Sequence, residues 1–132
     1  MKKLIFILIF IFSNTAKSDH LDIKTEELVL ENVSSFLECG FFYHITLALH
    51  EDGFINLSKD KEIKVTENID NFHDEATNLM KEVHFTFEED ITLTREIMNR
   101  IDKEIESDNF SDMALLLNNK YKSFCEKLAE YL

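Results

Sequence analysis

The chain has 132 residues, and its 14 Lys and Arg against 26 Asp and Glu give a formal net charge of −12. It has two Gly and no Pro, which excludes glycine-dependent phosphate loops, dinucleotide fingerprints and nucleophile elbows and disfavours an all-β fold with its many turns. The acidity argues against nucleic-acid binding, which needs clustered Lys and Arg, and the length fits one domain.

The amino-terminal segment, up to Ser18, has the pattern of a secretory signal peptide. Lys2 and Lys3 precede an unbroken apolar run, residues 4–12, and mostly small residues follow it. As a helix this run spans about 14 Å, too short for a bilayer core of about 30 Å. We therefore predict export to the periplasm or medium, cleavage after Ser18 or Ala16, and no stable membrane span afterwards. The alternative is an uncleaved anchor.

Cleavage after Ser18 leaves a single mature domain, residues 19–132. The leader holds three lysines and no acid, so the mature domain keeps 11 bases against 26 acids, a net charge of −15. In an exported protein an even pair of cysteines is more often a disulfide than two thiols. This favours a bond between Cys39 and Cys125.

Apolar residues recur at steps of three and four nearly throughout the mature domain, a spacing that predicts helices. The first predicted helix covers residues 25–51, with Thr25 as its N-cap. Asp52 and Gly53 end this helix, because glycine adopts the left-handed conformation of a C-cap at little cost.

The second predicted helix covers residues 59–83, with Ser58 or Asp60 as its N-cap. It carries Asp70 and His73, whose i, i+3 spacing places a carboxylate and an imidazole on one face, as in carboxylate-bridged di-iron bundles. Such sites need a second copy of the motif and two further carboxylates, whereas the sequence supplies one copy. We therefore predict no metal and no other cofactor, and a surface ion pair is the simpler interpretation.

Thr86 and Glu89 form the capping box of a third predicted helix, residues 87–106, and mark a break after the second one. The alternative is one long helix through both segments. The fourth predicted helix covers residues 111–131, after a turn at residues 107–110. Four helices with short connections predict an all-α fold, an up-down-up-down four-helix bundle.

The positions of the cysteines agree with this topology. Cys39 lies about 20 Å before the end of the first helix and Cys125 about 21 Å after the start of the fourth. In an up-down bundle these two helix ends meet, so the sulfur atoms lie at the same height. Gly40 would let the two backbones approach. We expect the disulfide to stabilise the fold by about 4 kcal/mol, from the entropy of loop closure.

Residues 36–49, FLECGFFYHITLAL, are apolar almost all round the first helix rather than along one stripe. One interpretation is that this helix is the central, most buried element. The other is that Phe42, Tyr43 and Leu49 are exposed and bind a protein partner or a second copy of the chain.

No pattern places a nucleophile beside a base, and there is no C-x-x-C motif for zinc or redox chemistry. We therefore predict no enzymatic activity. The leading hypothesis is a small exported, acidic helical protein of binding or interaction type, for example an inhibitor of a basic partner protein. The alternatives are an exported chaperone that responds to acid or stress, and a metal- or cofactor-binding helical bundle.

Overall fold

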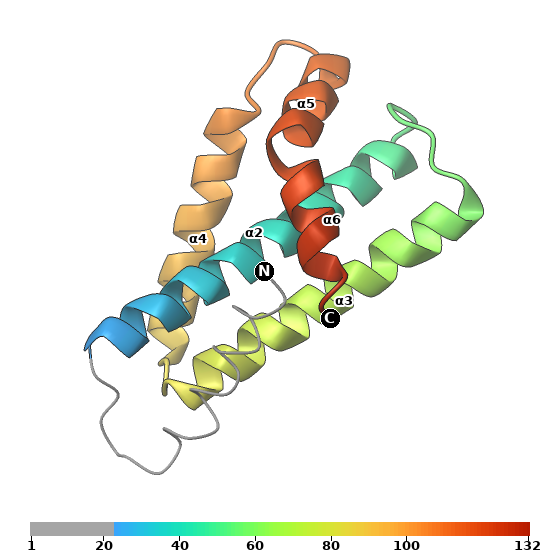
Figure 1. Cartoon of the computed structure of the whole chain (residues 1–132). Coiled ribbons are helices and arrows are strands. Elements are labelled where there is room, and N and C mark those ends of the chain that lie inside the picture. The colour runs from blue at the N-terminus through green and yellow to red at the C-terminus, as the bar shows by residue number, and fades with distance from the viewer. Residues whose placement is uncertain (1–22) are drawn as a thin grey trace.

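The computed structural model describes residues 23–132, and every structural statement below concerns that part of the chain. The predicted signal peptide and its cleavage site lie outside it. The described chain is all-helical, with four helices in sequence order and no strand (Figure 1). These are α2 (Ile23–Glu51), α3 (Lys59–Glu82), α4 (Phe87–Glu104), and a fourth helix made of α5 (Phe110–Leu117), η1 (Asn118–Lys122) and α6 (Ser123–Ala129).

Helix α2 includes Thr25, so the prediction that Thr25 is its N-cap is wrong. The other end agrees with the prediction: the helix ends at Glu51, and Gly53 takes a positive φ of 80°. The N–H of Phe54 then donates to the carbonyl of Leu49 at 2.9 Å, which closes the turn.

Helices α3 and α4 are separate, as the capping box predicted. The backbone N–H of Thr86 donates to the carboxylate of Glu89 at 2.7 Å, and the N–H of Glu89 donates to the hydroxyl of Thr86 at 3.2 Å. At the start of α3 the N-cap is Ser58, whose hydroxyl accepts from the N–H of Lys61 at 3.4 Å. Between the two helices His84 adopts a positive φ of 58°, where a glycine is more usual.

The fourth helix begins at Phe110, one residue before the predicted start, because Asn109 caps it. The side-chain oxygen of Asn109 accepts from the N–H of Asp112 at 2.8 Å. A π-turn, η1, interrupts this helix and was not predicted. A π-turn holds about one residue more than an α-turn. It thereby keeps Leu117, Tyr121 and Cys125, which are spaced four apart, in the buried core.

Helix α2 is the central element of the fold. It packs against α3, α4, α5 and η1, and Figure 1 shows it lying alongside α3 and crossing α4. Phe72 of α3, Ile101 of α4 and Leu117 of the fourth helix are fully buried, so each helix contributes to one core. The interpretation that the first helix is the most buried element is therefore confirmed.

Candidate functional site

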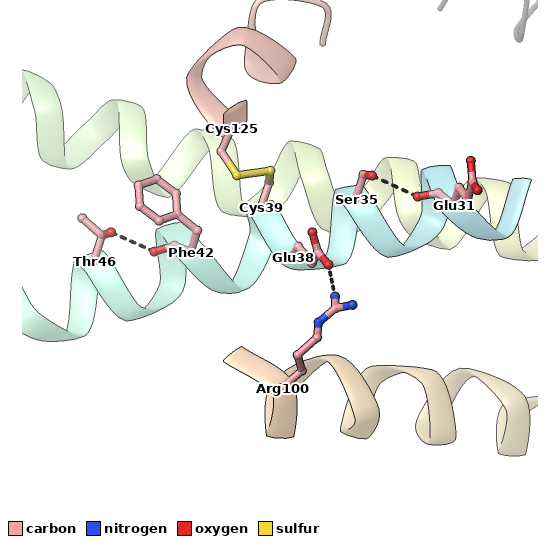
Figure 2. The surroundings of a disulfide bond; sticks show 8 residues. All are labelled: Glu31, Ser35, Glu38, Cys39, Phe42, Thr46, Arg100 and Cys125. Carbon is pink, nitrogen blue, oxygen red and sulfur yellow. Dashed lines mark hydrogen bonds and ion pairs between the residues drawn. A yellow bond between two sulfur atoms is a disulfide. The ribbon is translucent and has the colours of Figure 1, made fainter. Parts of the chain in front are cut away.

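Cys39 and Cys125 are joined by a disulfide that ties the fourth helix to α2 (Figure 2). Their Cα atoms lie 5.3 Å apart, and both side chains are 0% exposed. The role predicted for Gly40 is wrong, because a Cβ there would face Phe72 of α3 at an ordinary 3.7 Å. Gly40 therefore lies on the α3 side of the helix rather than making room for the fourth helix.

The predicted exposure of Phe42, Tyr43 and Leu49 is also wrong. Their exposed fractions are 3%, 5% and 6%. Phe42 meets Tyr43 edge to face with ring centroids 4.8 Å apart, and Tyr43 stacks on Phe72 with centroids 5.8 Å apart. The reason is the central place of α2, which has neighbouring helices on several sides and therefore buries apolar residues almost all round. These three side chains do not form an exposed docking face.

Asp70 and His73 are both exposed on α3. Asp70 lines an open hollow along this helix together with Lys59 and Ile63, and α3 supplies all the lining residues. Such a hollow does not enclose a small-molecule substrate. Within residues 23–132, no group of three or more His, Cys, Asp or Glu side chains is arranged to hold a metal ion.

Charged groups link α2, α4 and the fourth helix at the π-turn. Arg100 of α4 pairs with Glu38 of α2, and Figure 2 shows Glu38 extending toward α4 while the neighbouring Cys39 extends toward Cys125. Glu104 of α4 accepts a hydrogen bond from the hydroxyl of Tyr121 and pairs with the Nζ atom of Lys120 at 2.7 Å. The disulfide and these pairs together hold η1 and α6 against the other helices.

The ionisation of this cluster suits a structural role. Partial burial raises the pKa of Glu104, but the hydrogen bonds from Lys120 and Tyr121 and the charges of Lys120 and Arg100 outweigh it, so the pKa lies below its ordinary value. Burial and the neighbouring Glu104 raise the pKa of the Tyr121 hydroxyl. Burial, and then the charge of Glu126, raise the pKa of Tyr43 to about 12. Both phenols therefore stay protonated near neutral pH and are not activated nucleophiles.

His50 stabilises the connection between α2 and α3. Its Nδ1 atom accepts a hydrogen bond from the backbone N–H of Leu57 at 3.2 Å, and its Nε2 atom lies 3.8 Å from a carboxylate oxygen of Glu62. His44 and His73 are exposed. Each of these histidines thus has a place on the surface or in a turn rather than beside a nucleophile.

A feature that no sequence pattern indicates lies where two connections meet. Phe54 follows α2 and Phe110 begins α5, and their rings stack with centroids 4.2 Å apart at an angle of 26°. The rings remain 43% and 49% exposed. Five exposed acidic residues lie within four positions of Phe54 or Phe110 in the sequence. With the two rings they define what we call the aromatic–acidic end. These acids are Glu51, Asp52, Glu106, Asp108 and Asp112.

The comparisons with known proteins give no match: no family model, no curated protein and no solved structure resembles the chain significantly. Over residues 23–132, no helix combines the length and the apolar character that crossing a membrane requires. The function of this protein is therefore inferred from its own residues.

Proposed function

We propose that this chain is a small, acidic, non-enzymatic binding protein whose partner is a basic protein. The observation that carries the proposal is the excess of negative charge that the fold leaves unneutralised. Among residues 27–132, Lys and Arg pair with three acidic residues, Glu38, Glu104 and Glu126. The imidazole of His50 lies 3.8 Å from the carboxylate of Glu62. The whole chain has 26 acids against 14 bases.

Charge of one sign acts on partner choice and encounter rate. A negative surface attracts a positive partner over about 10 Å at moderate salt, repels acidic proteins and speeds productive encounter. The protein carries this surface on a small helical scaffold that is closed by a disulfide. An inhibitor that covers the basic surface of an enzyme is one concrete form of such a binding protein.

The proposal includes export. Lys2 and Lys3, the apolar residues 4–12 and the small residues up to Ser18 support a cleaved signal peptide. A disulfide is typical of oxidising compartments, which agrees with this route. Intact mass and amino-terminal sequencing of exported protein test the leader: a retained Met1 would contradict export with cleavage.

We further propose that the four helices are connected up-down-up-down.

Affinity capture tests the partner class. The bait is residues 19–132 with the disulfide intact, and the sample is the exported fraction at about 0.05 M and about 0.5 M salt. We expect basic proteins to be enriched at low salt and reduced at high salt. The matched control is a bait with less negative charge. In it the exposed residues Asp74 and Glu75 of α3 are replaced by Asn and Gln. Enrichment of no protein at either salt concentration, or of acidic proteins only, contradicts the proposal.

An acid-responsive chaperone is a second candidate, and Glu104 is the observation that favours it. Acid would protonate this carboxylate and weaken its bonds to Tyr121 and Lys120, which hold the fourth helix. Loosening of that helix would expose core residues such as Leu117. Near-ultraviolet circular dichroism and binding of a hydrophobic dye across an acid titration test this. Unchanged signals down to about pH 2 exclude the chaperone function.

A further inference from the structure

Two phenylalanines from distant connections meet in the open at one end of the molecule. Figure 1 shows the connection after α2 close to the start of α5, and the rings of Phe54 and Phe110 stack there with centroids 4.2 Å apart. Stacking covers one face of each ring, yet the side chains remain 43% and 49% exposed. Apolar groups that stay together in water after folding mark interaction sites more often than scattered ones do.

The two chain segments that carry this aromatic pair hold charges of one sign only. Residues 51–58 and 105–112 contain five Asp and Glu and no Lys or Arg. All five acids are exposed, so the chain next to each ring carries negative charge. A second copy of the chain would bring the same charges against this end, and repulsion between them disfavours a dimer here.

A guanidinium group can interact with both the aromatic rings and the carboxylates of this end. The face of an aromatic ring attracts a cation, and the planar guanidinium of arginine stacks on such a face while its N–H groups donate to carboxylates. An ammonium group is more strongly hydrated and has no plane to stack. A purely apolar partner would offer no hydrogen-bond donor to the carboxylates that flank the rings.

We propose that the aromatic–acidic end is the docking surface for an arginine side chain that a basic polypeptide presents. The guanidinium stacks on the exposed face of Phe54 or Phe110, and the flanking carboxylates of Asp52 and Asp108 accept its hydrogen bonds. This inference rests on the proposed function and adds to it the place where the basic partner binds and the side chain that this place selects.

A titration with a defined probe tests the surface. The probe is a synthetic helical peptide with a row of arginines on one face, and the comparison peptide has lysine at the same positions. The protein is residues 19–132, isotope-labelled and with the disulfide intact, observed by nuclear magnetic resonance. We expect the largest chemical-shift changes at Phe54, Phe110 and their neighbours, and weaker binding of the lysine peptide.

Substitutions make the test specific. Phe54→Ala and Phe110→Ala should each weaken binding of the arginine peptide by about threefold or more. Phe87→Ala is the matched control, because Phe87 is 78% exposed at the start of α4 and is not in the aromatic pair. Its binding should equal that of the unchanged protein. If an alanine variant fails to fold, as circular dichroism would show, Asp52→Asn with Asp108→Asn keeps both rings and should also weaken binding.

The outcomes separate this inference from the proposed function. Shift changes elsewhere on the surface, equal affinity of the Phe54→Ala and Phe87→Ala proteins, or no binding of the arginine peptide would overturn the docking surface. So would a dimer seen by analytical ultracentrifugation that Phe110→Ala dissolves. A basic partner captured from the exported fraction would leave the proposed function standing in each of these cases. Failure of that capture contradicts the function, while the peptide titration still reports on the surface.

Discussion

Tyr121 donates its hydroxyl hydrogen bond to the carboxylate of Glu104, and this bond joins the π-turn of the fourth helix to the last turn of α4. Tyr121 itself is buried in the core. The widened turn and this polar contact are therefore parts of one arrangement. The turn brings Tyr121 to the core, and Glu104 receives the hydroxyl at its edge.

Removing the hydroxyl should weaken this attachment. We expect Tyr121→Phe to lower the free energy of unfolding by about 1 to 2 kcal/mol, because it deletes a hydrogen bond to a charged acceptor and keeps the buried ring. Urea unfolding followed by circular dichroism measures it. Tyr131→Phe is the control at a partly exposed position near the end of the chain and should change the value little. Equal effects of both substitutions would contradict the role of Tyr121.

Acid should remove the contribution of Glu104 to stability. Its pKa in the folded protein lies below the ordinary 4.5, so folding favours the ionised form. The stability that this supplies is complete above pH 4.5 and is lost as the pH falls through the lowered value. We expect the unfolding free energies of the unchanged protein and Glu104→Gln to differ at neutral pH and to converge in acid. A difference that is constant with pH would contradict this.

Alkali should remove the contribution of Tyr43 to stability, as acid removes that of Glu104. Its pKa rises from 10.0 to about 12, so folding favours the neutral phenol. The contribution is complete below pH 10 and is lost as the pH rises from there to about 12. We expect the ultraviolet absorbance of tyrosinate to appear late for this residue, together with loss of helix. Tyr43→Phe should remove one phenol from the late absorbance change and leave that of Tyr121, whose pKa is also raised. A late change of the same size in this variant would contradict the assignment to Tyr43.

The disulfide should contribute more to the free energy of unfolding than any other bond that a single chemical change removes. We expect Cys39→Ala with Cys125→Ala to lower the unfolding free energy by about 4 kcal/mol, because the bond closes a long loop in the unfolded chain. The two cysteines are separated by 86 residues. Both are fully buried, so a reductant should act on the native protein only after it opens. Rapid reduction without unfolding would contradict this, and the reduced natural protein should match the variant.

The parts of the fold that could be predicted from sequence depend on local chemistry. The capping box of Thr86 and Glu89 and the cap at Ser58 are local hydrogen bonds, and the structure has both. The pairing of Cys39 with Cys125 was predictable because two cysteines allow one intramolecular bond and helix length fixes their heights.

Apart from the cap at Thr25, the errors concern contacts between helices. The sequence shows that α2 is apolar all round, but whether Phe42 faces a neighbouring helix or solvent depends on packing. The π-turn depends on Tyr121 and Cys125 meeting two different neighbours, Glu104 and Cys39. The stack of Phe54 on Phe110 joins two turns that lie far apart in the sequence, and neither turn carries a local signal for it.

The bond between Cys39 and Cys125 also makes the middle of the chain a covalent ring. The connections on either side of α3 and the one before α5 all lie within this ring. Exposed turns are where proteases cut most readily. A single cut in the turn that carries Phe54, or in the one before Phe110, opens the ring but leaves the two pieces joined through sulfur. The aromatic–acidic end therefore belongs to a molecule that remains one covalent unit after either of these turns has been cut.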